Sequence, residues 1–151
     1  TIEKILKGNF ITQQQIELKN QLKAPKFFKK DIIINWGQDC EKIFNFIRGF
    51  SPLPGARTTL HITNNKKEHK QQELIITKVS NYQIINPPNQ KIKNQFELLF
   101  DSKEKKITIQ NNNGRFDVEK IKIPGKKEID AVSFENGFLN KKENIGYYHF
   151  I

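Results

Sequence analysis

The sequence predicts a mainly β fold with one or two helices, namely a small, OB-like open Greek-key barrel preceded by an extended linker. Three observations lead to this prediction. Much of the chain consists of short segments in which apolar and polar residues alternate, separated by Asn, Gly and Pro. One earlier segment has the spacing of an amphipathic helix. The length of 151 residues suffices for a single hydrophobic core.

Residues 1–30 are predicted to lie outside the barrel. The stretch TIEKILKG at 1–8 has the pattern of the end of an amphipathic helix that stops at Gly8. The polar, glutamine-rich segment after it has no clear period and is predicted to be an extended linker. Because so short a helix needs a packing partner, we expect residues 1–30 to be the end of a preceding domain plus an interdomain linker.

A helix is predicted to begin near Gly37 and to end at Phe50. Apolar residues recur there at the i, i+3, i+4 and i+7 spacing of one buried helix face. They are Cys40, Ile43, Phe44 and Ile47. The corner SPLPG at 51–55 prevents the helix from continuing, since proline lacks a backbone N–H and has a fixed φ angle. We expect this corner to hold the first strand at a fixed angle.

The rest of the chain is predicted to form short strands. They are 57–63, 73–79, 82–86, 95–100, 105–110 and 115–123. The sequence NNNG at 111–114 predicts a tight hairpin turn, since Asn and Gly tolerate positive φ angles. A final short helix is predicted at 129–139. The barrel domain therefore spans 31–140, and we expect residues 141–151 to form a C-terminal arm.

The charge of the chain favours polyanionic partners. Lys and Arg number 26 against 16 Asp and Glu, for a formal net charge of +10. A composition rich in Lys, Ile, Asn and Phe is also what an AT-rich genome produces, so codon bias is an alternative source of part of the lysine excess. Arginine resists that bias and occurs only as Arg48, Arg57 and Arg115. No apolar run approaches the ~18 residues that cross a bilayer, so no membrane association is expected.

No complete active site is predicted. The three histidines, His61, His69 and His149, are far apart in the sequence and share no metal-ligand spacing. We therefore expect surface or strand histidines and no metal site. The single cysteine, Cys40, excludes an intrachain disulfide and is predicted to be a core thiol of the helix. Recognisable phosphate-binding loops and nucleophile motifs do not occur in the sequence.

Several blocks of the sequence resemble the C-terminal domain of methionyl-tRNA formyltransferases, in the same order. They are A-P-K at 24–26, I-N-W at 34–36, F-I-R-G at 46–49, S-P-L-P-G-A-R-T-T-L at 51–60, I-K-I-P-G-K-K-E-I at 121–129 and S-F-E-N-G at 133–137. The chain departs from the family pattern at four positions. Leu53 replaces a usual aromatic residue, Arg57 a common Trp, and Ser133 and Glu135 the usual Asp and Leu.

This resemblance implies a two-part enzyme. In the family, an N-terminal domain binds 10-formyltetrahydrofolate and carries the catalytic residues, and a C-terminal OB-like domain helps to hold the initiator tRNA. We therefore expect no catalytic residue and no cofactor in this chain. The expected partners are initiator tRNA and the N-terminal formyltransferase domain of the parent protein, which is expected to be a cytoplasmic monomer active in translation initiation.

The resemblance and the charge together suggest site residues. The candidates for nucleic-acid binding are Lys26, Lys29, Lys30, Arg57, Lys126 and Lys127. The candidates for a structural motif are Trp36, Arg48, Pro52, Pro54, Gly55 and Gly125. We expect Trp36 to fill the core, with base stacking as the alternative. Arg48 is expected to bond to the last helix carbonyls or to the corner, with phosphate contact as the alternative.

Two other functions fit the same sequence. The chain could be the accessory domain of a sugar-nucleotide N-formyltransferase, whose second domain has a similar pattern. It could also be a free-standing OB-type module that binds nucleic acid. The P-G-K-K turn and the high positive charge favour the tRNA-binding domain, because a nucleotide-sugar enzyme does not need to bind a long polyanion.

Overall fold

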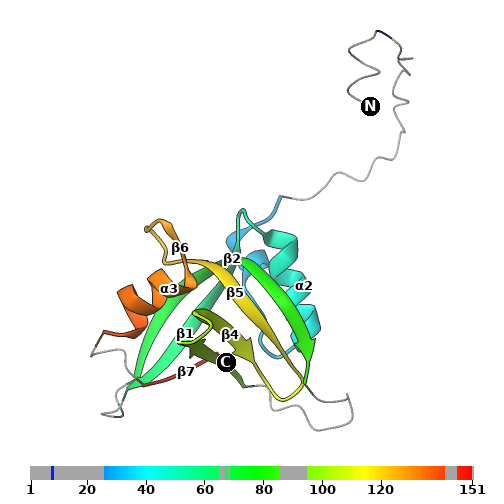
Figure 1. The fold of residues 1–151 in the computed structure, drawn as a ribbon. Coiled ribbons are helices and arrows are strands. Elements are labelled where there is room, and N and C mark those ends of the chain that lie inside the picture. The colour runs from blue at the N-terminus through cyan, green and yellow to red at the C-terminus, as the bar shows by residue number, and fades with distance from the viewer. Residues whose placement is uncertain are drawn as a thin grey trace.

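The structure is a computed structural model that describes residues 8, 26–64, 67, 69–85, 95–141 and 146–150. Its elements are η1 (Lys29–Ile32), α2 (Cys40–Phe50), β1 (Ala56–Asn64), β2 (His69–Ile84), β3 (Phe96–Asp101), β4 (Lys106–Gln110), β5 (Gly114–Lys122), β6 (Glu128–Asp130), α3 (Ala131–Phe134), the π-helical turn η2 (Glu135–Leu139) and β7 (Gly146–Phe150). Figure 1 shows a β-barrel flanked by α2 and α3. The predicted helix end at 1–7 and the linker up to residue 25 fall outside the described residues.

The strands form one antiparallel sheet that closes into a barrel. Their order is β2-β1-β7-β3-β4-β5-β6, and an additional pairing joins β2 to β5. This pairing makes a ring of all the strands except β6, which extends the sheet from β5. The predicted mainly β class with a small barrel is thus confirmed, but the barrel is closed and not open.

The closure depends on the length of β2, which is one strand of 16 residues where the sequence predicted two. Its first part pairs with β1, so that Ile76 lies opposite Ala56, and its second part pairs with β5. The register shifts between Ser80 and Gln83, and Asn81 has a φ angle of 52°. Such a bulge bends a strand without ending it. The polar break that suggested two strands is therefore a bend within one.

Residues 146–150 differ most from the prediction, since this part of the expected arm forms β7 in the barrel wall. β7 pairs with β1 on one side and with Phe96 and Glu97 of β3 on the other. Phe150 is completely buried, and its ring stacks on Trp36 with the centroids 4.4 Å apart. The strand therefore supplies both backbone pairing and core volume.

The helices begin slightly later than predicted. Asp39 is the N-cap of α2, because Asn35 first closes a turn by accepting a hydrogen bond from the Gly37 N–H at 2.9 Å. The predicted helix at 129–139 begins at Ala131, where the Asp130 side chain accepts a hydrogen bond from the Ser133 N–H at 2.8 Å. The predicted NNNG turn does join β4 to β5.

Candidate nucleic-acid interface

The linker lysines are displayed by a short segment with two firm anchors. Ile32 and Ile34 are buried, and the Ile34 N–H donates a hydrogen bond to the Arg57 carbonyl at 2.8 Å. η1 is capped by Asp31, whose carboxylate accepts a hydrogen bond from the Phe28 N–H at 2.8 Å. This arrangement leaves Lys26, Lys29 and Lys30 exposed around exposed phenylalanines.

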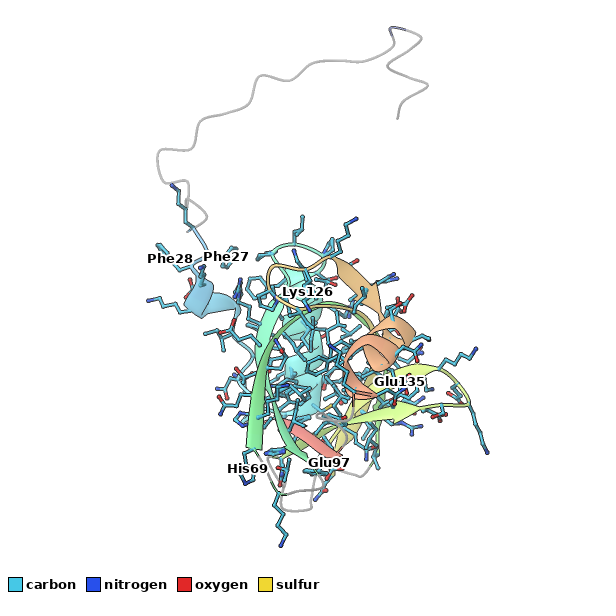
Figure 2. The ribbon with its side chains drawn as sticks, turned by 90° about the vertical axis from the view of Figure 1, so that its left-hand side faces the viewer. Phe27, Phe28, His69, Glu97, Lys126 and Glu135 are labelled. Atoms are coloured by element: carbon cyan, nitrogen blue, oxygen red, sulfur yellow. The ribbon has the colours of Figure 1, made fainter. Side chains whose placement is uncertain are left out.

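The second predicted group of lysines lies in the turn between β5 and β6. Gly125 has a φ angle of 79°, and the Lys126 N–H donates to the Ile123 carbonyl at 2.9 Å. Lys126 and Lys127 are both exposed. In Figures 1 and 2 this turn and η1 lie at the same end of the barrel. We call this region, comprising Lys26, Lys29, Lys30, Lys126 and Lys127, the lysine end.

Ion pairing distinguishes the lysine end from three other lysines of the domain. Lys42 pairs with Asp39 at 3.5 Å, Lys78 pairs with Glu119, and Lys106 lies between two carboxylates. Among the described residues, no carboxylate pairs with any of the five lysines at the lysine end. Their ammonium groups therefore carry a positive charge that no carboxylate in the described part of the chain offsets.

Arg57 and Arg48, the two arginines of the motif region, are both engaged within the protein. An Arg57 guanidinium nitrogen lies 4.0 Å from a Glu73 carboxylate oxygen, at the edge of ion-pair distance. The Arg48 guanidinium lies 5.5 Å from the centroid of the Phe44 ring and donates to the Asn45 side chain at 3.4 Å. Arg48 thus reaches back along α2 and not onto the last carbonyls or the corner.

The corner after α2 is held against the outer surface of β2. The Ser51 hydroxyl donates to the Thr77 carbonyl at 2.5 Å, and the Gly55 N–H donates to the Phe50 carbonyl at 2.9 Å. Gly55 has a φ angle of 77°, and a Cβ at this position would lie 2.6 Å from a methyl carbon of Ile75. Only glycine fits there. The exposed Pro52 and Pro54 flank this contact and end the helix.

Trp36 connects the linker to the core. Its side chain is 3% exposed, and its indole N–H donates to the buried Thr58 hydroxyl at 2.8 Å. The ring packs between Phe96 and Phe150, with centroid distances of 5.1 and 4.4 Å. In this position the ring is not accessible to a nucleobase.

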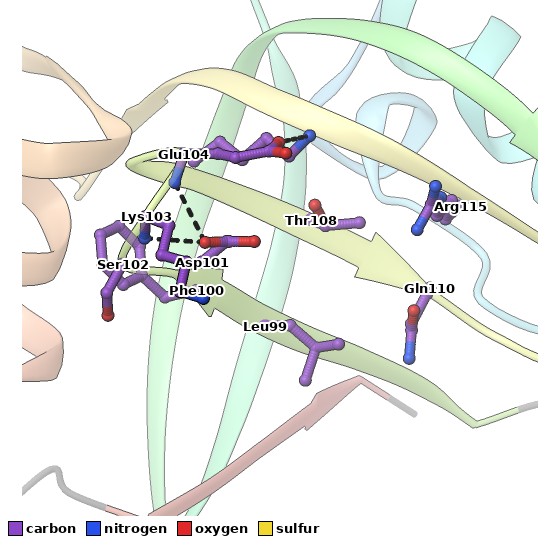
Figure 3. A pocket seen from close by; sticks show the side chains of 10 residues that line it. Leu99, Phe100, Asp101, Ser102, Lys103, Glu104, Thr108, Gln110 and Arg115 are labelled. Atoms are coloured by element: carbon purple, nitrogen blue, oxygen red, sulfur yellow. Dashed lines mark hydrogen bonds and ion pairs between the residues drawn. The ribbon is translucent and has the colours of Figure 1, made fainter.

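A groove of about 690 Å³ lies along the β3–β4 hairpin (Figure 3). Its turn is fixed by Asp101, whose carboxylate accepts hydrogen bonds from the N–H groups of Lys103 and Glu104 at 2.8 and 3.0 Å. These bonds lower the pKa of Asp101. Lys106 in the same groove pairs with Glu104 and Asp117. Because its charged groups are largely satisfied by one another, we assign this groove no function.

The three histidines, although far apart in the sequence, come together in space. His61 lies opposite His149 in the β1–β7 pair, and their ring centroids are 5.5 Å apart. The position of His69 is set by the pairing of β1 with β2, in which His69 lies opposite Thr63. Sequence reasoning missed this cluster because β7 was not predicted. Among the described residues, no group of three or more His, Cys, Asp or Glu could hold a metal ion.

A helix long and apolar enough to cross a membrane is absent from the described part of the chain. The only cysteine, Cys40, is buried at the start of α2, and burial raises the pKa of its thiol to about 12. A Cβ on Gly114 would lie 3.0 Å from the Cys40 Cβ, so this corner of the core is closely packed. Cys40 therefore has the properties of a core residue and not of a nucleophile.

Comparison with known proteins agrees with the sequence motifs. The family model described as "Formyl transferase, C-terminal domain" matches residues 26–139. The chain belongs to this family. A methionyl-tRNA formyltransferase of Porphyromonas gingivalis is 31% identical over 141 residues, covering 91% of the chain and 41% of that protein. A protein of the same name from Buchnera aphidicola is 29% identical over 142 residues, covering 94% and 40%. The chain thus spans about two fifths of the length of these relatives.

The matched range of the formyl transferase C-terminal domain contains most of the site described above. It includes all five residues of the lysine end and the corner at 51–55. It ends at residue 139 and so excludes β7, which carries His149 and Phe150. The lysine end therefore lies within the family's domain, whereas the histidine cluster is completed by a strand beyond the match.

Proposed function

We propose that this formyl transferase C-terminal domain is the tRNA-holding part of a methionyl-tRNA formyltransferase. In this proposal it binds initiator tRNA through the phosphate backbone. A separate N-terminal domain transfers the formyl group from 10-formyltetrahydrofolate to the amino group of the bound methionine. The protein acts in the cytoplasm as a monomer, at translation initiation.

The observation that carries the proposal is the lysine end. Five exposed lysines without a carboxylate partner among the described residues lie at one end of the barrel. They stand on supports that the core fixes, namely Ile32 and Ile34 for the linker and β5 for the turn. Binding of backbone phosphates requires positive charge at a suitable position. It does not require the planar, two-pronged hydrogen-bonding group of arginine. Lysines held on a rigid support meet this requirement.

Exposed apolar side chains at the same end favour a partner domain. Phe27, Phe28 and Leu53 are 67%, 62% and 82% exposed. Phe27 touches Phe50 edge-on with centroids 5.3 Å apart, so the linker and the end of α2 share one apolar surface. Contiguous exposed apolar surface is typical of interfaces. We propose that the N-terminal formyltransferase domain packs here, because the relatives are more than twice as long as the match.

The names of the relatives favour tRNA over a nucleotide sugar. The matching proteins from Porphyromonas gingivalis and Buchnera aphidicola are both named methionyl-tRNA formyltransferase. The net charge of +10 also suits a long polyanion better than a nucleotide sugar.

The proposal is tested by the salt dependence of tRNA binding. The double variant Lys29→Gln/Lys126→Gln removes one charge from each part of the lysine end. We expect weaker binding, and a slope of log affinity against log salt that is flatter by roughly 1.4–1.8 units, because each lost phosphate contact contributes ~0.7–0.9. Fluorescence anisotropy with labelled initiator tRNA at four salt concentrations measures both quantities.

The matched control is Lys103→Gln/Lys105→Gln, which removes the same charge from the exposed turn of the β3–β4 hairpin. Figure 2 shows this hairpin on the other side of the barrel from η1. The control should change the slope much less. Equal losses from the two pairs would indicate a diffuse positive surface, and the assignment of the lysine end would be abandoned.

A further inference from the structure

A groove containing all three histidines lies at the opposite end of the barrel from the lysine end. Figure 2 places His69 there, and Phe27, Phe28 and Lys126 at the other end. The groove has a volume of about 380 Å³. Its lining consists of His61, Ile62, Thr63, His69, Lys70, Gln71 and His149. We call it the histidine groove. A groove of this size accommodates a small ligand or one segment of a larger one.

The lining contains hydrogen-bonding and potentially cationic groups, and no described Asp or Glu takes part in it. The carboxylate opposite His149 in the strand register is that of Glu97 on β3. That carboxylate accepts a hydrogen bond from the Tyr147 hydroxyl at 2.5 Å, so it has a partner outside the groove. The electrostatic character of the histidine groove is therefore positive when its imidazoles are protonated.

The hydrogen bonds that the rings already make limit which ring nitrogens could bind a ligand. His69 Nδ1 lies 3.2 Å from the Thr63 hydroxyl, within hydrogen-bond distance. The other ring nitrogen of His69, Nε2, does not take part in this bond. His149 Nδ1 is buried without a hydrogen-bond partner among the described residues, so any bond from this ring to a ligand must involve Nε2. A metal ion is disfavoured because the described residues offer no set of three ligands.

We propose that the histidine groove is a pH-dependent oxyanion site, which binds a phosphate group between His61, His69 and His149. The phosphate group is either a free ion or part of an RNA backbone. The site is distinct from the lysine end and would give the domain a second contact for anions, one that strengthens as the pH falls.

The electrostatics of the cluster agree with this chemistry. Burial lowers the pKa of His149, and the nearby His61 and His69 lower it further, whereas Glu97 acts in the opposite direction. Tyr147 beside His149 has its pKa raised to about 12, chiefly by burial, so it stays neutral. Clustered imidazoles thus repel one another when protonated. A bound anion relieves that repulsion and must in return raise the pKa of His149.

The experiment measures this reciprocal effect by NMR on the full chain. The ring proton signals of the histidines are followed from pH 5 to 8 at constant ionic strength, in sodium chloride and in sodium sulfate, whose charge is constant over this range. We expect sulfate to raise the pKa of His149 by about one unit, which corresponds to about tenfold tighter binding to the protonated ring. A third titration with a ten-nucleotide uridine RNA distinguishes the two sources of the phosphate group.

A shift in both sulfate and RNA would identify a backbone-phosphate site, and a shift in sulfate alone a site for free oxyanions. Identical pKa values in chloride, sulfate and RNA would overturn the proposal. The variants His61→Asn and His69→Gln should each abolish the shift at His149, and His69 is exposed, so its replacement leaves the fold intact. Lys103→Gln, which removes one charge elsewhere, should retain the shift. Because the sulfate titration contains no RNA, its result is independent of the proposed tRNA function.

Discussion

The lysine end and the histidine groove are both positive regions at opposite ends of one barrel, and they are built differently. The lysines lie on two local segments, a linker turn and a hairpin-like turn, each of which is recognisable as a short motif. The histidines lie on β1, β2 and β7 and meet only because of strand register. Lysine supplies a fixed charge, whereas histidine supplies one that depends on pH. Similar surface charge can therefore arise from local sequence or from tertiary pairing.

Trp36 connects the two regions, and its removal should have the largest effect. It follows the linker that carries the lysines, and it stacks on Phe150, the neighbour of His149 in β7. Trp36→Ala should lower the free energy of unfolding by ~3–5 kcal/mol, because it leaves a large cavity. Chemical denaturation measures this value. The histidine titrations should also change, since β7 loses its core contact.

The control is Trp36→Phe, which keeps an aromatic ring and loses the hydrogen bond to Thr58. We expect a loss of about 1–3 kcal/mol, from the smaller ring and the unpaired hydroxyl. If Trp36→Ala left stability almost unchanged but abolished RNA binding, Trp36 would be a stacking surface, and its assignment to the core would be wrong.

The two positive-φ glycines near the lysine end should differ in their tolerance of a side chain. At Gly55 an alanine Cβ would meet Ile75 at 2.6 Å, whereas at Gly125 no atom lies within 4 Å. Gly55→Ala should cost about 2–4 kcal/mol, from the left-handed backbone and the overpacking together. Gly125→Ala should cost about 1–2 kcal/mol, from the backbone alone. Thermal and chemical unfolding of both variants tests this order, and equal costs would contradict the described corner.

The smallest expected effect is the pH dependence of stability at the histidine groove. The pKa of His149 is lowered from its ordinary value of 6.5, so the unfolded chain binds this proton more readily than the folded one. Its contribution to stability is thus complete above pH 6.5 and declines as the pH falls through this value. His149→Gln should remove this decline. This decline is measured by the free energies of unfolding of the unaltered protein and of His149→Gln at pH 7.5, 6.5 and 5.5 in chloride. Parallel dependences on pH for the two proteins would refute the assignment of the decline to His149.

The sequence predicted the parts that depend on local pattern. Of the predicted helix face, Cys40, Ile43 and Ile47 are buried and Phe44 is partly buried against the core, and the NNNG turn joins its two strands. The Pro-Gly corner and the P-G-K-K turn were recognisable because their residue types restrict the backbone wherever they occur. The class of the fold followed from these elements.

The errors in the predicted strands share one cause. Strand pairing between distant parts of the chain overrides the local sequence pattern. Asn81 is a residue type that predicts the end of a strand, but β2 continues past it because β2 pairs with both β1 and β5. The five residues of β7 are too few to give a clear alternation, and they become a strand because β1 and β3 leave a gap that their backbone can fill. Together with the pairing of β2 with β5, this strand converts the predicted open barrel into a closed one.

The sequence by itself determined the family of the domain, the core face of α2, the corner that ends this helix, and the positions of the exposed lysines. Each of these is encoded within a few consecutive residues. Only the tertiary structure decided that the barrel closes, that Trp36 stacks on Phe150, and that His61, His69 and His149 share one groove. These features join residues that are distant in the chain, and their positions are fixed by strand register and by the packing of one shared core.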